Sequence, residues 1–378
     1  MVKMFFILFG VLAFCQAVCG QSVSKVWVAD RKDGTYMNPV LHADYSDPDV
    51  CAVGDDFYMT ASSFNCTPGL PILHSKDLVN WKLVNYALKT IEPEEFYNKP
   101  QHGKGVWAPS IRYHNGEFYI YWGDPDFGIF MVKAKDPQGE WDKPVLVKAG
   151  KGMIDPTPLW DEDGKVYLVH AWAGSRAAFN SVVTVCEMNP EGTKVISEPV
   201  LVFDGNDGVN HTVEGPKFYK RNGYYYILAP AGGVVTGWQL ALRSKNVYGP
   251  YEVKRVMAQG STDINGPHQG AWVETNSGES WFVHFQDLEV IGRIIHLQPV
   301  EWVDGWPVMG ENADTGLCGQ PVMRYKKPDV GGEYPITTIP TSDDFSSDKL
   351  GLQWQWQANN KEEWYSLTEN KGSLRLYS

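Results

Sequence analysis

The sequence contains little positive charge and little cysteine, and each shortage excludes a class of function. Its 378 residues carry 33 Lys and Arg against 45 Asp and Glu, a net charge of −12. Nucleic acid and anionic membrane surfaces would repel such a protein, so we expect neither as a partner. Only six cysteines occur, and their spacings match no zinc motif. A neutral ligand fits this charge better, and the abundant Trp and Tyr side chains suit the flat apolar faces of sugars.

Long hydrophobic runs are also missing beyond the first residues of the chain. Lys3 is followed by an apolar stretch at residues 4–14 and then by small residues, which is the pattern of an export signal. The sequence therefore predicts a signal peptide at residues 1–20 and a secreted or periplasmic protein without a membrane span. Cys51 and Cys66 could form a disulfide in an oxidising compartment, and the sequence leaves that pairing open.

Sustained helical periodicity is the third feature that the sequence lacks. Short β-rich runs alternate with Asn-Gly, Asp-Gly and Gly-Asp turns instead, which is typical of an all-β protein. A turn glycine that leads into an aromatic strand recurs about every 48 to 62 residues, a period typical of four-stranded propeller blades. The five glycines are Gly54, Gly116, Gly164, Gly223 and Gly278. We therefore predict a five-bladed β-propeller.

A second landmark and a change of pattern predict the domain limits. About 18 to 22 residues after each of the first four glycines, a short sequence such as Ser75-Lys76-Asp77 precedes a turn. The repeats fade after about Met309, and residues 334–342 contain two prolines and are typical of a linker. Residues 343–378 return to a β pattern but are too few to bury a core alone. We expect a propeller over residues 21–333 and an incomplete second β domain that docks poorly unless the propeller covers it.

The third landmark carries chemistry. At the start of the first strand of each blade, a polar residue precedes a proline or glycine. First strands line the central channel of a propeller, so equivalent positions converge on its axis. In this alignment Asp47, Asp155, Glu214 and His268 fill one position in four blades, and Ala108 fills it in the second blade. We therefore expect these four polar side chains to face one another.

Three carboxyl groups near one axis repel each other, so at least one should have a raised pKa. Glycoside hydrolysis uses such a set, because one protonated carboxyl donates to the leaving oxygen while an ionised carboxylate activates water or attacks. The structural alternative is that Asp-Pro pairs cap turns, or that acids in a channel are bridged by water or a cation. Turn capping does not require the acids to align, so the alignment favours catalysis.

The motifs around these residues resemble those of one enzyme family. Over about residues 38–306 the chain resembles glycoside hydrolase family 43, five-bladed propellers that include β-xylosidases and α-L-arabinofuranosidases. Residues 343–378 look like the start of the family's C-terminal concanavalin-like β-sandwich, cut short. The shared motifs are Tyr45-Ser46-Asp47-Pro48-Asp49, Trp107-Ala108-Pro109, Asp155-Pro156-Thr157-Pro158-Leu159-Trp160, Thr212-Val213-Glu214-Gly215-Pro216, His268-Gln269-Gly270 and Arg293.

The resemblance implies a role for each acid. Asp47 would be the general base that activates water, and Glu214 the general acid. Asp155 would orient Glu214 and raise its pKa, which agrees with the effect of a nearby anion on a carboxyl group. The family inverts anomeric configuration, so the resemblance also implies a wider separation of Asp47 and Glu214 than a retaining pair shows.

Four further residues match family positions or candidate sugar contacts. Arg293 would hydrogen-bond sugar hydroxyls, although a salt bridge under the fifth blade is the structural alternative. Phe64 and Trp107 are candidate stacking platforms, with core packing as the alternative for Phe64. His268 resembles an axial histidine that lies beside a bound calcium or its waters. No cofactor is expected to be required, and a structural calcium would contact His268 through water.

The substrate implied is a neutral plant cell-wall oligosaccharide or polysaccharide. The long connection around residues 88–105 predicts a raised rim, which favours exo attack on a chain end. We therefore expect an exo-acting hydrolase that removes terminal xylose, arabinofuranose or both. The sequence does not choose between these sugars and predicts no oligomeric state. The alternatives are an endo-arabinanase with an open groove and a non-catalytic carbohydrate-binding propeller, although a propeller without catalysis should have lost an axial acid.

Overall fold

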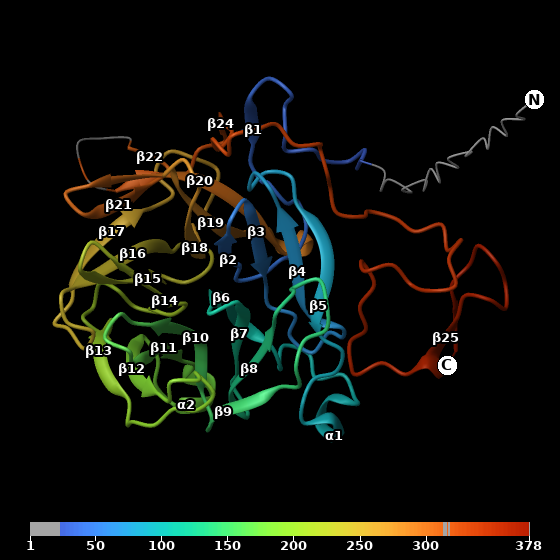
Figure 1. Ribbon diagram of the computed structural model, residues 1–378, viewed down its shortest axis with the longest axis horizontal. Coiled ribbons are helices and arrows are strands. Elements are labelled where there is room, and N and C mark those ends of the chain that lie inside the picture. Colours follow the sequence, from blue (N-terminus) through green and yellow to red (C-terminus); the bar gives the residue numbers. More distant parts are fainter. Residues whose placement is uncertain (1–22, 313–315, 317, 378) are drawn as a thin grey trace, which may run out of the picture.

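The computed structural model describes residues 23–312, 316 and 318–377. Five sheets surround a central axis (Figure 1), so the prediction of an all-β, five-bladed propeller is confirmed. The predicted signal peptide, residues 1–20, lies outside the described residues. Within the described ranges, no helix is long and apolar enough to cross a membrane.

Each blade contains four strands that follow one another in sequence from the axis outward. Blade one comprises β2 (Asp49–Val53), β3 (Asp56–Thr60), β4 (Gly69–Ser75) and β5 (Lys82–Leu88). Blade two comprises β6 (Trp107–His114), β7 (Glu117–Asp124), β8 (Gly128–Ala134) and β9 (Val145–Ala149). Blade three comprises β10 (Met153–Trp160), β11 (Val166–Trp172), β12 (Val182–Met188) and β13 (Val200–Asp204).

Blade four has two additional strands at its outer edge. It comprises β14 (Lys217–Arg221), β15 (Tyr224–Ala231), β16 (Trp238–Ser244), β17 (Glu252–Met257), β23 (Gly319–Gln320) and β22 (Glu311–Asn312). Blade five comprises β18 (His268–Glu274), β19 (Ser280–Asp287), β20 (Arg293–Val303) and β21 (Trp306–Met309). The innermost strands β2, β6, β10, β14 and β18 lie nearest the centre in Figure 1.

The five glycines of the sequence repeat lie in the tight turns between the first and second strands of the blades. Their φ angles run from 60° at Gly54 to 86° at Gly278, a left-handed conformation that glycine adopts without steric cost. A Cβ at any of the five would meet no atom within 4 Å, so backbone conformation alone explains the residue type.

The hydrophobic core is divided into layers between neighbouring blades. Each layer joins strands of one blade to strands of the next, and burying one large aliphatic side chain contributes about 1.5–3 kcal/mol. Buried pairs that represent the five layers in order are Ile72 with Ile120, Met131 with Leu168, Val185 with Ile227, Leu228 with Phe282, and Met59 with Trp281. The last pair joins blade five to blade one and so closes the ring.

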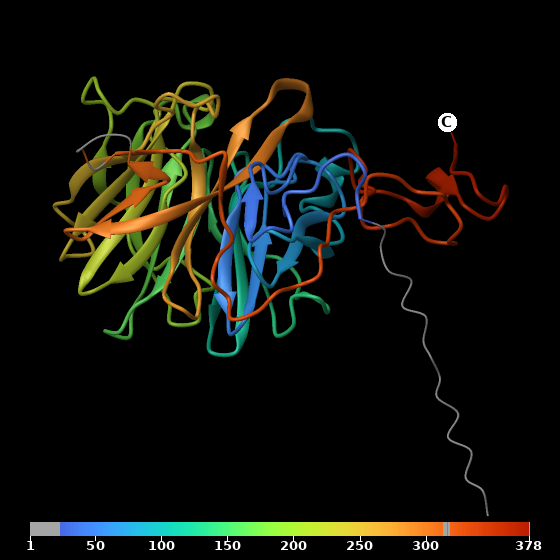
Figure 2. The same cartoon turned by 90° about the horizontal axis from the view of Figure 1, so that it is seen from above.

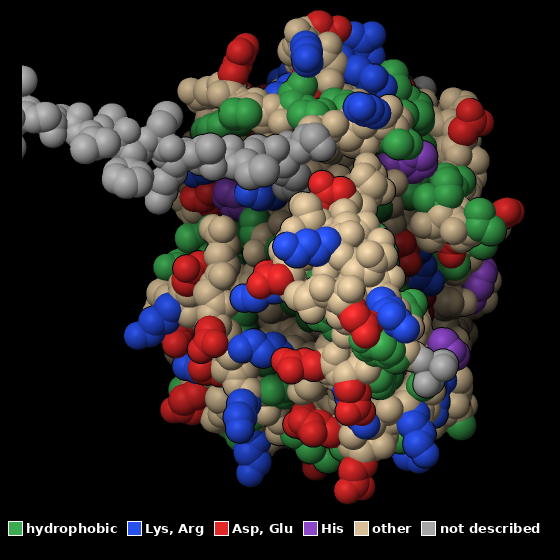
Figure 3. Space-filling model, turned by 90° about the vertical axis from the view of Figure 1, so that its right-hand side faces the viewer, with side chains coloured by type: hydrophobic (Ala, Val, Ile, Leu, Met, Phe, Trp, Pro, Cys, Tyr) green, Lys and Arg blue, Asp and Glu red, His purple; other side chains and the backbone are tan. Residues whose placement is uncertain are grey.

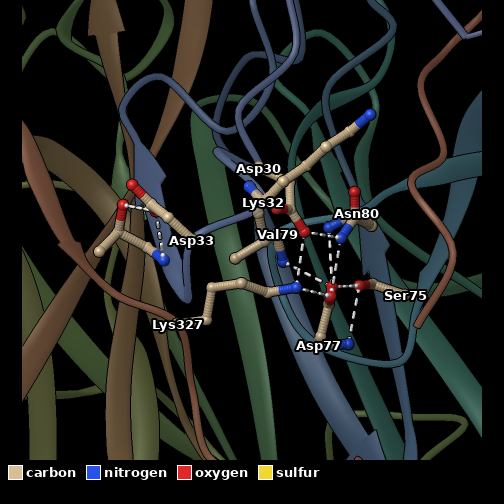
Figure 4. Close-up of polar contacts among 9 residues, drawn as sticks. Asp30, Lys32, Asp33, Ser75, Asp77, Val79, Asn80 and Lys327 are labelled. Carbon is tan, nitrogen blue, oxygen red and sulfur yellow. Dashed lines mark hydrogen bonds and ion pairs between the residues drawn. The ribbon is translucent and has the colours of Figure 1, made fainter. Parts of the chain in front are cut away.

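Segments from both ends of the propeller sequence secure this closure. β1 (Thr35–Met37) pairs with β24 (Arg324–Lys326). Next to them the ammonium of Lys327 lies 2.6 Å from a carboxylate oxygen of Asp30 and 3.1 Å from one of Asp77 (Figure 4). The side-chain amide of Asn80 donates to both carboxylates. This polar cluster ties the N-terminal segment, blade one and the segment after blade five together.

The tail beyond the linker runs beside blade one (Figure 2), and it contains one small sheet of β25 (Tyr365–Ser366) and β26 (Arg375–Leu376). It docks through backbone bonds between Thr67 and Trp356, which exchange N–H···O contacts of 2.7 and 2.8 Å. Figure 3 faces the side on which the tail lies, and acidic and basic side chains are interspersed over it.

Asn359 is the buried anchor of the tail. Its side chain accepts a bond from the amide of Ile91 and donates to the carbonyl of the same residue. The backbone amide of Asn359 donates to the carbonyl of Tyr97 at the end of the short helix α1 (Glu94–Tyr97). The propeller therefore covers this part of the tail and satisfies its polar groups, which is the condition under which docking was expected.

The disulfide that the sequence left open is not formed in this structure. Cys51 lies in β2 and Cys66 in the loop after β3, and both thiols are free. Burial raises the pKa of both thiols, which keeps them protonated near neutral pH.

Candidate active site

Every blade begins with a residue in an unusual backbone conformation. The φ angles are 55° at Asp47, 35° at Ala108, 58° at Asp155, 57° at Gly215 and 36° at Gln269. In β6, β10 and β18 this residue lies at an irregularity in the pairing with the next strand. Bulges of this kind turn a side chain out of the regular alternation of a strand. Each blade thus repeats one backbone conformation where its first strand begins, and three of the blades combine it with a bulge.

This backbone pattern corrects the alignment predicted from the sequence. The residues that share the conformation of Asp47 and Asp155 are Gly215 in blade four and Gln269 in blade five. Glu214 and His268 each lie one position earlier, so they are not equivalents of the two aspartates. The predicted convergence nevertheless occurs, as the contacts described below show.

Glu214 and Asp155 are brought together by Gly215. The amide of Gly215 donates to a carboxylate oxygen of Asp155 over 2.7 Å, which places the Asp155 carboxylate against the backbone that carries Glu214. A Cβ at Gly215 would lie 2.7 Å from the side chain of Gln269, and its φ is positive, so glycine is required here. The Glu214 side chain keeps 29% of its surface accessible, whereas Asp155 is buried.

Asp47 is held by three donors. The hydroxyls of Ser46 and Ser62 donate to one of its carboxylate oxygens over 2.7 and 2.6 Å. The guanidinium of Arg293 donates to the other oxygen over 2.8 Å. Ser62 also accepts a bond from the amide of Ala108 over 2.7 Å, so blade two helps to fix the carboxylate.

The environments displace the pKa values of the carboxyl groups in opposite directions. Burial acts to raise the pKa of Asp47, but Arg293 and the two serine hydroxyls outweigh it and leave that pKa lowered. Burial, followed by the charges of Asp155 and Asp47, raises the pKa of Glu214. Burial also raises the pKa of Asp155, with the amide of Gly215 opposing it. The site therefore contains an ionised carboxylate next to a carboxyl that retains its proton, which is the condition for acid–base catalysis.

His268 is buried at the start of β18, with its Nε2 atom 3.7 Å from a carboxylate oxygen of Glu214. Burial lowers its pKa to about 3, so the imidazole is neutral and the contact is not an ion pair near neutral pH. Neither ring nitrogen has a hydrogen-bond partner in the protein, which suits contact with water. Within the described residues, no group of three His, Cys, Asp or Glu side chains could cage a metal directly. The unpartnered ring nitrogens of His268 are compatible with water ligands of a cation.

Arg293 begins β20 and contacts the centre through the carboxylate of Asp47. Its guanidinium bonds Ser46 and Asp47 and lies 3.7 Å from a carboxylate oxygen of Asp287. The salt bridge weighed as the structural alternative is therefore present, with the Asp47 carboxylate as its main partner. About a quarter of the side chain stays accessible for other contacts.

Phe64 and Trp107 lie side by side at the junction of blades one and two. Phe64 exchanges two backbone bonds of 3.0 Å with Val106, the residue before Trp107. The indole of Trp107 donates to Gly103 over 3.0 Å, and the guanidinium carbon of Arg176 lies 5.6 Å from the centre of its ring. Both aromatic rings are half-buried, so neither is confined to the core.

Several residues that shape the centre were not singled out from the sequence. Ser62 reaches Asp47 because β2 and β3 pair. A single serine in the sequence does not indicate such a contact. Asp49, Arg112 and Lys217 form a buried charged cluster under the carboxylates. Charged residues inside predicted strands could have indicated that cluster, because isolated charges are rarely buried.

Comparisons with known proteins agree with this geometry. The sequence model for glycosyl hydrolases family 43 matches residues 36–307, and that for a beta xylosidase C-terminal concanavalin A-like domain matches residues 342–378. A beta-xylosidase of Formosa agariphila is 38% identical over 96% of this chain. A non-reducing end alpha-L-arabinofuranosidase of Bacteroides ovatus is 35% identical over 93% of it.

Solved structures show the same likeness. The xylan beta-1,4-xylosidase of Bacillus halodurans superposes with a TM-score of 0.78 at 29% identity, over 90% of this chain and 68% of that one. The chain spans 65% and 67% of the Formosa and Bacteroides relatives, and 64% of a relative from Xylanibacter ruminicola that is 42% identical over 93% of this chain. The match over most of its length shows that the chain belongs to glycoside hydrolase family 43.

Proposed function

We propose that the protein is an inverting, exo-acting glycosidase that removes terminal xylose, arabinofuranose or both from hemicellulose oligosaccharides. The observation that carries the proposal is that two carboxyl groups of one centre have pKa values shifted in opposite directions. The pKa of Asp47 is lowered and that of Glu214 is raised. Each group therefore holds the protonation state that its step requires near neutral pH. Relatives named beta-xylosidase and alpha-L-arabinofuranosidase support the choice of sugar.

In the proposed reaction Asp47 removes a proton from a water molecule as the water oxygen attacks the anomeric carbon. The bond from that carbon to the leaving oxygen breaks, and Glu214 donates its proton to this oxygen. One sugar and a shortened chain are released, and the two carboxyl groups exchange protons with solvent before the next turnover. Arg293 and the serines keep Asp47 ionised, and Asp155 supplies the negative charge that helps Glu214 to keep its proton.

The rim of the site supports attack on chain ends. The connection between β5 and β6 contains α1, and the tail docks against it through Asn359. We infer that this packed structure raises one side of the site above the channel, which would favour a pocket over an open groove. A neutral cell-wall glycan as substrate also agrees with the net charge of −12.

The test is hydrolysis by the full-length protein of nitrophenyl β-xyloside, nitrophenyl α-arabinofuranoside and linear arabinan. We expect release of single sugars from one or both aryl glycosides and the inverted anomer as the first product by proton NMR. Release of oligosaccharides from arabinan would identify an endo-arabinanase instead. A folded protein that releases nothing, but binds xylo-oligosaccharides by calorimetry, would identify the non-catalytic alternative.

Two further proposals concern the surroundings of the site. A calcium held through water at His268 is supported by the two unpartnered ring nitrogens, and equilibrium dialysis with calcium should show binding that His268→Ala abolishes. Export with cleavage after residue 20 is supported by the sequence pattern alone, and N-terminal sequencing of the mature protein should start at Gln21.

A further inference from the structure

A lysine without any exposed surface lies under the carboxylate centre. Lys217 is the first residue of β14, only three positions after Glu214, and its side chain is completely buried. Burying an ammonium group is costly unless it is paired and hydrogen-bonded. Nothing in the proposed hydrolysis yet uses this charge, so its position requires an explanation.

The ammonium of Lys217 reaches across the channel to two other blades. It donates to the carbonyl of Pro109 in blade two over 2.7 Å. It also lies 3.9 Å from a carboxylate oxygen of Asp49 in blade one, a residue that is itself completely buried. Pro109 directly follows Ala108, and both lie at the irregularity in the pairing of β6. Lys217 therefore connects three blades immediately below the site.

The buried cluster around Lys217 carries a surplus of positive charge. Asp49 accepts a hydrogen bond of 2.6 Å from the guanidinium of Arg112. The same guanidinium also lies over the aromatic ring of Tyr219. One carboxylate thus serves two cations. Burial leaves the pKa of Lys217 lowered and the charge of Arg112 adds to this shift, while the charges of Asp49, Asp155 and Asp47 oppose it and favour the ammonium form.

The surplus charge acts on two of the three acids of the site. The charge of Lys217 lowers the pKa of Asp155 in opposition to burial, and Asp47 and Lys217 likewise favour each other's charged form. From blade five, Arg293 also favours ionisation of both aspartates. Among the remaining neighbours, His268 is neutral near pH 7.

We propose that Lys217 is a positioning residue for the hydrolysis proposed above: its buried ammonium joins blade four to blades one and two and places a positive charge that favours ionisation of Asp47 and Asp155. The inference rests on the proposed function and adds to it a residue that touches neither substrate nor the reacting atoms. A purely structural lysine would support folding equally well but would leave the ionisation of the two aspartates unchanged.

The test is the pH dependence of kcat/KM for the full-length protein and for Lys217→Met, which keeps most of the side-chain volume and removes the charge. We expect the acidic limb of the profile to move to higher pH by about one unit, because both aspartates become harder to ionise. Lys220→Met is the matched control: it removes a lysine from the same strand, where Lys220 pairs with Asp161 instead, and should leave the limb in place.

Asp49→Asn tests the same cluster in the opposite sense. It removes the anion and keeps the shape, so the acidic limb should move to lower pH. The inference would be overturned if Lys217→Met lowered activity without moving the acidic limb. It would also be overturned if the acidic limb moved in the same direction in Lys217→Met and Asp49→Asn. If neither variant folds by circular dichroism, the cluster is structural and the inference fails. An inactive wild-type protein would refute the proposed function itself, whereas an active one isolates the role of Lys217.

Discussion

Replacing Asp155 by Asn should lower the pKa of Glu214 and thereby move the alkaline limit of activity. In the native site the pKa of Glu214 is raised from 4.5 to about 8, which corresponds to about 5 kcal/mol in favour of the protonated form. Burial is the largest cause and the charge of Asp155 is the second, followed by that of Asp47. Asn keeps the size of the side chain and an oxygen that can accept the bond from Gly215.

Removing one nearby charge of this kind changes a pKa by roughly one to two units. The sign follows from the role of Glu214, which must be protonated to donate. Activity is therefore present below its pKa and lost as the pH rises through it. For the wild type we expect the alkaline limb of kcat/KM near pH 8, and for Asp155→Asn between about pH 6 and 7.

The assay is kcat/KM from pH 4 to 10 on an oligosaccharide whose leaving group needs protonation. Asp163→Asn is a suitable control, because Asp163 lies on the exposed turn between β10 and β11 and accepts hydrogen bonds from Lys165 and Tyr167. Its profile should match that of the wild type. If Asp155→Asn lost activity with an unmoved alkaline limb, the electrostatic role of Asp155 would be refuted and only its contact with Gly215 would remain.

Three further predictions concern the surroundings of the centre. Arg293→Met should move the acidic limb of activity to higher pH. Among the groups that lower the pKa of Asp47 against the effect of burial, Arg293 has the largest effect. Burial lowers the pKa of His170 and His284 to about 4. The free energy of unfolding, measured by urea denaturation, should therefore be highest above pH 6.5 and fall toward pH 4 by up to about 3 kcal/mol for each histidine. A constant free energy of unfolding over this range would contradict the prediction. Asn359→Ala should release the tail from blade one at a cost of about 2 kcal/mol, seen as faster proteolysis of residues 352–360 with the blades still protected.

The sequence predicted the parts of the fold that repeat. Turn glycines such as Gly54 and Gly278 occupy the same turn in every blade, because only one residue type tolerates that conformation without cost. The three acids were identified because they precede proline or glycine at strand starts. The repeat thus contained both the architecture and the location of the centre.

What the sequence could not supply was geometry at the level of one residue. The alignment placed Glu214 level with Asp47, whereas the backbone conformation makes Gly215 the equivalent position. A bulge shifts the register by a single residue and leaves no separate mark in a sequence pattern.

Long-range pairing was also hidden in the sequence. Arg293 and Asp47 are 246 positions apart and meet only when blade five closes against blade one. The bond between Lys217 and Pro109 crosses the channel, and the docking of Asn359 depends on a loop more than 260 positions away. Such contacts follow from ring closure and cannot be derived from local propensity.

The central claim, that Glu214 acts as acid and Asp47 as base, is tested most directly by varying the leaving group. Glu214→Gln and Asp47→Asn should be compared on xylobiose and on an aryl xyloside whose dinitrophenolate departs without protonation. We predict that Glu214→Gln loses its activity on xylobiose but regains most of it on the activated substrate, because the acid is no longer needed. Asp47→Asn should stay inactive on both, because water still requires a base. Equal loss in both variants on both substrates would contradict the assignment.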